Sequence, residues 1–331
     1  MAFTAAGYDN FVNNTMFTVL DAVKDMQPDM VRSIFMSVPW NPGQGDTVEF
    51  TSLTPPTFGK RVDENERYAE SNPIEGDTLS KRQIQYGSKM NITRRMAKFN
   101  KHQDAVNYAS AIVSMNKDIL DLEMTQQVFG EADQTTFTPA GKPAVNIATA
   151  DTLALASASH TINGAGGTWT NLSTAGVPSD DNLTLALEAG GKNTVDDFGT
   201  NVTPNFNAVV IGNNPYMTRK FKQLLGSTLS PENSNNAVNV YDGAMKLIVL
   251  KHGHKNSAGV AKTNGEEYRW MIMDTDMARL SLQYQIAEEA NVEPRFTDSD
   301  TLLASILCTQ FAAFAAVRPQ GMVFNLNTTK P

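Results

Sequence analysis

Cysteine is almost absent from this sequence: of its 331 residues, only Cys308 carries a thiol. A single cysteine excludes an intramolecular disulfide, so packing and hydrogen bonds must hold the fold together, which suits folding in a reducing cytoplasm. Because Cys308 lies within an apolar run, we expect its thiol to be buried and unreactive.

Long hydrophobic runs and an excess of positive charge are also missing. No apolar stretch reaches the roughly 18 to 20 residues that a membrane-spanning helix needs, and the first residues lack the basic and apolar regions of a signal peptide. We therefore expect no membrane span and no export. The net charge of −8 argues against a protein that binds DNA tightly by neutralising phosphates.

Motifs for catalysis or cofactor binding are equally sparse. The glycine-rich stretch 164–167 has no following Lys-Ser/Thr pair of a phosphate loop, and no Gly-x-Ser-x-Gly elbow occurs. Only two of the four histidines, His252 and His254, lie close in sequence, and a metal there would need distant ligands. We expect no catalytic residue, cofactor or metal. A soluble binding protein or hydrolase that uses these two histidines is the alternative from another class.

Alternating side chains predict two strands in the first third of the chain. Val48 and Phe50 share one face of a short strand, Asp46–Thr51. A longer strand, Arg82–Thr93, alternates apolar with polar residues. We expect the two to form a long, open hairpin with a polar segment, Thr57–Ser80, between them. The apolar positions of the longer strand are Ile84, Tyr86, Met90 and Ile92.

Charge is sorted along this hairpin. Its tip is acidic, whereas residues 78–103 carry basic side chains and no carboxylate. Complementary charge of this kind sets register and partner choice between molecules, so we predict contacts between neighbouring copies. A solvated hairpin with a charged surface is the simpler alternative. The candidate interface residues are Asp63, Glu64, Glu66, Arg67, Glu70, Lys81, Arg82, Arg94, Arg95 and Lys98.

A long helix is predicted over about 98–129, with Gly130 placed to end it. At 1.5 Å per residue it would exceed about 40 Å, which suits a strut across the subunit. Apolar residues recur every three or four positions, and we expect this stripe to pack in the core. Its members are Ala105, Tyr108, Ile112, Met115, Ile119, Leu122 and Phe129.

The remaining segments predict an α/β-like lobe and a strand-rich end. Gly190-Gly191 is expected to interrupt a helix over about 180–198, and residues 131–181 form an irregular excursion. The apolar run Leu302–Val317 fits strand or helix, and Arg318-Pro319 breaks it. The further predicted elements are a strand at Ala208–Ile211, a helix to about Leu225, and strands at Met245–Leu250, Tyr268–Met273 and Met322–Leu326.

Three stretches carry a resemblance to a known family. SASHTINGAGGTWTNLS (157–173) looks like a glycine-rich loop of one phage capsid group, Asn207–Leu225 resembles a strand and helix of the family's axial lobe, and FTDSDTLLASILCTQFAAFAAVRPQGMVF (296–324) is similar to its closing strands. Together with the order of elements, they resemble the major capsid proteins of tailed bacteriophages with the Hong Kong 97-like fold. The resemblance covers nearly the whole chain.

The resemblance implies an α+β fold with five parts. They are an N-terminal arm (1–38), an extended β-hairpin loop with its base (39–98), a peripheral domain with a long spine helix (99–181), an axial domain (182–290), and C-terminal strands that return to the peripheral domain (291–331). The arm is expected to hold an amphipathic helix near 16–26, although an ordinary N-terminal helix fits as well.

The implied function is structural. Copies would assemble as hexamers and pentamers into an icosahedral shell that encloses DNA without tight specific binding, in the cytoplasm of a host bacterium. The implied partners are a portal, a decoration protein and, since the chain begins directly with the arm, a separate scaffolding protein. Residues 301–316 contain neither Asn nor a carboxylate, so we expect no covalent lysine-to-asparagine cross-link. A phage tail or decoration subunit is the alternative within structural proteins.

Overall fold

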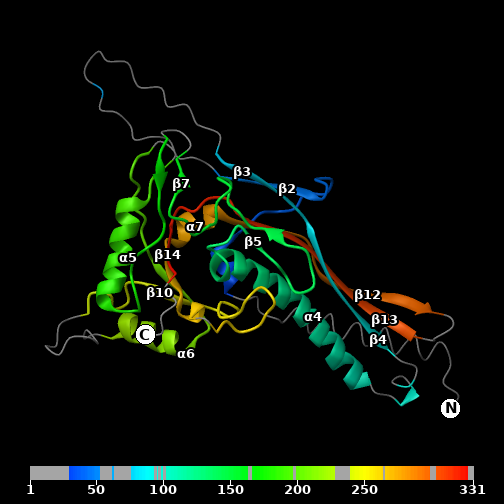
Figure 1. The fold of residues 1–331 in the computed structure, drawn as a ribbon. Helices are drawn as coiled ribbons and strands as arrows, with labels where there is room; N and C mark the ends of the chain where they lie inside the picture. Colours follow the sequence, from blue (N-terminus) through cyan, green and yellow to red (C-terminus); the bar gives the residue numbers. More distant parts are fainter. Residues whose placement is uncertain are drawn as a thin grey trace.

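The computed structural model describes residues 30–52, 62, 76–92, 95, 98–99, 102–162, 166–196, 199–227, 239–263, 265–298 and 303–326. The expected arm helix near 16–26 and most of the hairpin tip lie outside these residues. Two four-stranded sheets form the framework (Figure 1). One is long and runs beside the helix α4 (His102–Thr125), and the other lies with the helices α5 (Asp180–Asn193) and α6 (Pro215–Gly226).

The long sheet has the order β1-β12-β13-β4. Its central strands are antiparallel, with Ala312 of β13 opposite Ile84 of β4, whereas β1 runs parallel to β12. The apolar run that fitted strand or helix is therefore a strand. The four strands are β1 (Met36–Ser37), β12 (Leu282–Asp298), β13 (Leu303–Ala316) and β4 (Ile84–Ile92).

The predicted hairpin pairing is wrong. The strand β2 (Thr47–Thr51) pairs with β3 (Thr78–Arg82), most of which we assigned to the polar segment between the two predicted strands. After Gln83 the chain continues as β4 in the long sheet. The reason is that the two apolar faces find different partners: Val48 and Phe50 pack on alanines of β13, whereas buried β4 residues such as Tyr86 reach α4.

The predicted long helix is present, but over most of its length it buries a different face, and of the predicted stripe Phe129 near its end is buried. The helix α4 continues into a π-helical turn, η1 (Gln126–Gly130), and ends at Gly130 as predicted. Tyr108, Met115 and Ile119 of the predicted stripe are 62%, 67% and 41% exposed. The buried face includes polar side chains that form hydrogen bonds with the sheet. The spacing of apolar residues alone therefore predicted the wrong buried face. Its apolar members are Val106, Ala109, Val113, Leu120 and Met124.

The second sheet has the order β10-β9-β11-β14 and confirms the predicted α/β lobe. One face packs against α5 and α6 through alternate residues such as Val209 and Ile211. Asn214 caps α6 by accepting hydrogen bonds from the amides of Tyr216 and Met217, and Pro215 begins the helix. The strands are β10 (Lys246–Leu250), β9 (Ala208–Gly212), β11 (Trp270–Met273) and β14 (Met322–Asn325).

The expected interruption of α5 does not occur. The helix runs through Gly190 and Gly191 to Asn193. A Cβ on Gly190 would lie 2.3 Å from the ring of Phe206, whereas one on Gly191 would meet nothing within 4 Å. Gly190 is therefore needed for close packing rather than for a break.

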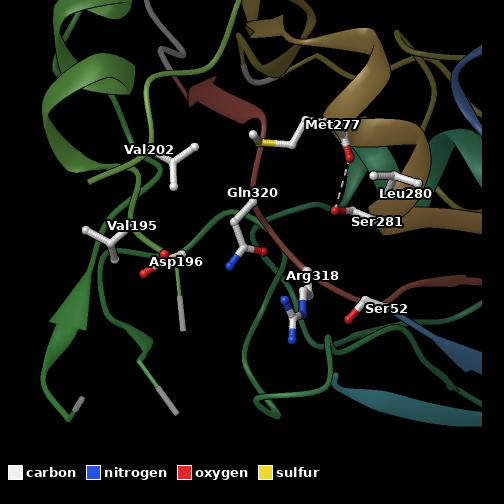
Figure 2. Close-up of a pocket in the computed structure, with 9 residues that line it drawn as sticks. All are labelled: Ser52, Val195, Asp196, Val202, Met277, Leu280, Ser281, Arg318 and Gln320. Atoms are coloured by element: carbon white, nitrogen blue, oxygen red, sulfur yellow. Dashed lines mark hydrogen bonds between the residues drawn. The ribbon is translucent and has the colours of Figure 1, made fainter. Parts of the chain in front are cut away.

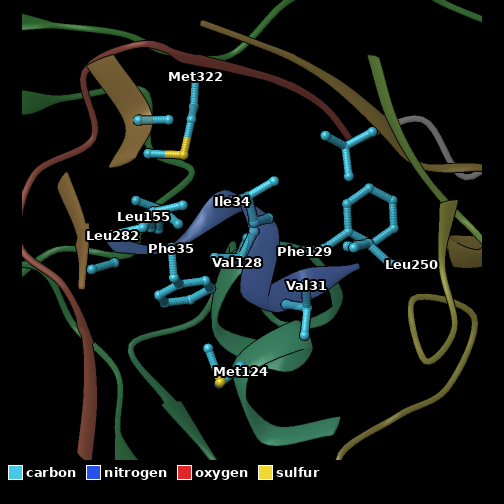
Figure 3. Close-up of a cluster of buried hydrophobic side chains, with 14 of the residues drawn as sticks. Val31, Ile34, Phe35, Met124, Val128, Phe129, Leu155, Leu250, Leu282 and Met322 are labelled. Carbon is cyan, nitrogen blue, oxygen red and sulfur yellow. The ribbon is translucent and has the colours of Figure 1, made fainter. Parts of the chain in front are cut away.

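One apolar cluster joins the two sheets. The short helix α2 (Val31–Ile34) inserts Val31 and Ile34 between α4, η1 and both sheets (Figure 3). Leu250 of the second sheet and Leu282 of the long sheet belong to the same cluster. The sheets therefore share a core, and the chain that precedes α4 in sequence is anchored against its C-terminal half.

Candidate functional site

The root of the β2–β3 hairpin is fastened by Arg318 and Asp77. The Nε of Arg318 donates to Oδ2 of Asp77 at 2.9 Å, and the Arg318 side chain is only 9% exposed. A buried guanidinium needs such a partner. The sequence pattern predicts Arg318 only as part of a break after an apolar run and gives no reason to pair it with Asp77. The signal that we missed is an arginine directly after a 16-residue apolar run, Leu302–Val317, where burial demands a carboxylate.

Two predicted interface residues contact other parts of the same chain. The Nε of Arg82 lies 2.6 Å from Oδ2 of Asp46, and this hydrogen bond, with the charge of Arg82, lowers the pKa of Asp46. The Nζ of Lys81 donates to the carbonyl of Asn146 at 2.8 Å, and burial lowers the pKa of Lys81. The first contact joins the two strands of the hairpin at the end away from Asp77, and the second joins β3 to Asn146.

The other predicted interface residues are either exposed or outside the described residues. Arg95 and Lys98 are exposed. Asp63, Glu64, Glu66, Arg67, Glu70 and Arg94 lie outside the described residues. The structure therefore does not bring the acidic and basic candidates together within the described part of the chain, and contact between copies stays a prediction.

An apolar pocket of about 280 Å³ lies beside the hairpin root (Figure 2). Its apolar lining residues are Val195, Val202, Met277 and Leu280. Its two hydroxyl groups donate to carbonyls, from Ser52 to Asp77 and from Ser281 to Met277. No histidine or cysteine is among the described residues that line it. The pocket suits an apolar side chain better than a reacting substrate.

A buried histidine lies next to the root. His160, in β7 (His160–Thr161), is 0% exposed, and its Nδ1 lies 2.8 Å from Oδ2 of Asp151. Its Nε2 lies 3.2 Å from the carbonyl of Leu155. Burial alone would raise the pKa of Asp151, but hydrogen bonds with His160 and Thr149 outweigh it and lower that pKa. Trp169 of β8 (Thr168–Trp169) stacks near the ring, so the histidine of the glycine-rich loop has a packing role.

The remaining titratable residues that the sequence singled out are His252, His254 and Cys308. His252 is 4% exposed, with its Nε2 4.0 Å from Oδ1 of Asp118, and burial lowers the pKa of His254. Across the described parts of the chain, no three His, Cys, Asp or Glu residues gather closely enough to hold a metal ion. Cys308 is buried, and burial raises the pKa of its thiol. No helix among the described residues is long and apolar enough to cross a membrane.

The interface between α4 and the long sheet is polar at its centre. The hydroxyl of Tyr86 donates to Oε2 of Glu123 at 2.6 Å, and burial raises the pKa of Glu123. Asn116 accepts from Ser88 at 2.8 Å and donates to the carbonyl of Cys308 at 3.0 Å. These bonds fix the register of the helix on the sheet.

No protein-family model and no curated protein matches this chain. Solved structures do. A chain of Gordonia phage Cozz has a TM-score of 0.54 and 13% identity, with 92% of this chain and 87% of that chain covered. A chain from the capsid of an empty GTA particle has a TM-score of 0.52 and 9% identity, with 92% and 91% covered. A chain of Mycobacterium phage Adephagia has a TM-score of 0.51 and 11% identity, with 92% of each covered. At such identities a likeness shows the fold, so this chain has the fold of these two phage chains and of the GTA capsid chain.

Proposed function

We propose that this chain is the major capsid protein of a tailed bacteriophage. It is a structural subunit, not an enzyme, and assembles as hexamers and pentamers into an icosahedral head around double-stranded DNA. The observation that carries the proposal is the fold shared with a GTA capsid chain over 92% of this sequence. Because nearly the whole chain takes part in that likeness, the proposal concerns the entire subunit and not one module.

The proposed parts of a Hong Kong 97-like subunit keep the boundaries 1–38, 39–98, 99–181, 182–290 and 291–331. The second sheet with α5 and α6 supports an axial domain, and α4 with the long sheet supports a peripheral domain with a spine helix. The last strand, β14, pairs with β11, so the C-terminal segment also completes the axial sheet. The ion pair of Arg318 with Asp77 then holds the extended loop to the segment that joins the two domains.

The charge of the chain fits a container. A net charge of −8 gives the shell no strong attraction for phosphates, so packaged DNA is enclosed without tight binding. The proposed partners are further copies of the chain, a separate scaffolding protein, a portal and a decoration protein. Many modest contacts between copies would give a stable shell through multivalency.

Electron microscopy of the chain, expressed alone and with its scaffolding protein, tests this proposal. Closed shells or ring-shaped capsomers are expected. Tubes would favour the alternative of a tail subunit, and binding only to preformed shells would favour a decoration protein. A monomer under both conditions would exclude self-assembly as the function.

Charge reversal tests the proposed contacts of the extended loop. Arg95 and Lys98 are exposed, so replacing both with Glu should leave the subunit folded and reduce particle yield at least tenfold. The matched control replaces the exposed Lys142 and Lys246 with Glu, which changes the net charge by the same amount. Normal yield from the first variant would contradict the role of the loop charges.

The absence of a covalent cross-link is also a proposal. Mature particles boiled in denaturant should give a single band at 36.1 kDa, the mass of the chain. A ladder of covalent oligomers would overturn it.

A further inference from the structure

The second sheet carries helices of opposite charge over its two edges. The helix α6 has three basic side chains and no carboxylate, whereas α5 has three acidic side chains and one lysine. In the strand order β10-β9-β11-β14, α6 packs on β10 and β9, and α5 packs on β14. Figure 1 shows α5 along one side of this lobe and α6 across its end. The basic residues are Arg219, Lys220 and Lys222, and the acidic residues are Asp180, Asp181 and Glu188.

The outer face of α6 forms an open hollow of about 570 Å³. Arg219 and Lys222 are exposed and line it, together with Pro215 and Thr218. Within the described parts of the chain, neither Arg219 nor Lys222 forms an ion pair. Long basic side chains give such a surface apolar walls through their carbon stems and keep the charge at the rim. The hollow therefore suits an apolar side chain that is flanked by carboxylates.

The exposed face of α5 offers such a group. Asp181, Leu185 and Glu188 follow one another at intervals of four and three residues, so they form one line on the helix. All three are exposed, and Leu185 is a large apolar side chain with 47% of its surface accessible. Glu188 pairs with Lys192 at 2.9 Å, but both side chains are more than half exposed. A surface pair of this kind contributes little stability and can be exchanged for another.

Complementary surfaces on different edges of one domain join copies head to tail. A contact of this type is heterologous, and it closes into a ring when the rotation between neighbours allows. The hexamers and pentamers of the proposed function require a contact of this type. Charges at the rim of such a contact set its register and reject wrong partners.

We propose that Leu185 of one copy inserts into the α6 hollow of the next copy. Asp181 and Glu188 then face the basic rim of that hollow. This inference rests on the proposed function and names the surfaces through which neighbouring copies meet. A contact within one chain and the binding of nucleic-acid phosphates by α6 are the rival explanations.

Charge exchange in the full chain tests the contact. The basic-face variant carries Arg219→Glu and Lys222→Glu, and the acidic-face variant carries Asp181→Lys and Glu188→Lys. Each variant should reduce the yield of particles about tenfold, because like charges then meet across the contact. The combination of all four changes restores opposite charges and keeps the net charge of the chain at −8. Its yield should return to that of the unmodified chain.

The outcomes separate this inference from the proposed function. If unmodified chains form no particles, the proposed function itself fails, and the contact falls with it. If unmodified particles form and both variants match their yield, or if the combined variant does not recover, only the contact is overturned. Particles of normal yield that hold less DNA in the basic-face variant would assign α6 to phosphate binding and would also overturn it. The control with Lys142→Glu and Lys246→Glu should assemble normally, and circular dichroism checks that each variant folds.

Disulfide trapping tests the geometry, because the only native thiol is buried. Cys308 is replaced by Ala, and cysteines are placed at Leu185 and at the exposed Gln223, which lines the hollow. Mild oxidation of assembled chains should give covalent oligomers larger than a dimer on a non-reducing gel. A control that pairs Leu185→Cys with Lys142→Cys should give far fewer. A faster-migrating monomer would show a contact within one chain, and a ladder that stops at the dimer would show a two-fold contact. Either result would overturn the proposal.

Discussion

The two sheets of this chain are held in contrasting ways. Strands β9, β11 and β14 of the second sheet are buried at every position, between α5 and α6 on one face and the shared core on the other. Strand β4 of the long sheet alternates between buried and exposed residues, and its contact with α4 contains Tyr86, Glu123, Ser88 and Asn116. The second sheet is specified by apolar fit on both faces, whereas the contact of the long sheet with α4 is also specified by hydrogen bonds.

This contrast has a mechanical meaning for the proposed role as a shell subunit. A sheet that is filled on both faces behaves as a rigid block, because interiors are close-packed and resist changes of volume. A helix that meets its sheet through a few directional bonds depends on each of those bonds. Changes of volume should therefore harm the second sheet, and changes of bonding partner should harm the long sheet.

The largest loss of stability is expected where the two sheets are joined. Arg318 lies between β13 of the long sheet and β14 of the second sheet and pairs with Asp77. Asp77→Ala should lower the free energy of unfolding by about 2 to 4 kcal/mol, because a buried guanidinium loses its carboxylate. Urea denaturation measures this. Asp46→Ala, which removes the exposed partner of Arg82, is the control and should change stability little. Equal effects would contradict the bracing role of Arg318.

Two adjacent glycines test the apolar fit of the second sheet. Gly190→Ala should destabilise by about 1 to 3 kcal/mol, because its Cβ would collide with Phe206. Gly191→Ala has open space and should stabilise the helix by about 0.5 to 1 kcal/mol. Thermal unfolding of both variants would show opposite shifts. A neutral Gly190→Ala would mean that Phe206 can move aside and that the second sheet is less rigid than argued.

The polar contact of α4 predicts a dependence on pH. Burial raises the folded-state pKa of Glu123 above its ordinary value near 4.5. The folded protein therefore holds the proton more tightly than the unfolded chain, and stability falls as pH rises from about 4.5 through the folded pKa. Glu123→Gln keeps an acceptor for Tyr86 and removes this loss. Its stability relative to the unmodified protein should increase across that window in urea titrations. A constant difference at all pH values would show that Glu123 is not a buried carboxyl of this kind.

The smallest predicted effect is on the chemical reactivity of Cys308, the thiol in the long sheet. Burial raises the pKa of Cys308, and its strand is covered by α4. A thiol reagent at neutral pH should leave the folded protein unmodified for hours and react within minutes in urea. Met115→Cys places a thiol at a position of α4 that is 67% exposed, so this variant is a matched positive control. Rapid labelling of native Cys308 would show that the long sheet opens locally.

Local sequence predicted local structure well. Alternation in residues 46–51 and 84–92 corresponds to β2 and β4, and the helix predicted to about Leu225 corresponds to α6. Such features depend on neighbours within a few residues, where backbone geometry dictates the period and the capping group. The helical segment also ends at Gly130 as predicted, but the structure gives another reason for a glycine there, because a Cβ on Gly130 would lie 2.2 Å from Oε1 of Gln126.

The tertiary structure alone decided which surfaces meet. The sequence determined the approximate positions of several elements, among them β2, β4, α4 and α6. It did not determine that β2 pairs with β3, that Tyr108 and Met115 face outward, or that Arg318 needs Asp77. Each of these depends on partners that are distant in sequence, and burial of a polar group becomes favourable only when such a partner supplies its hydrogen bond. Periodicity in one segment cannot contain that information.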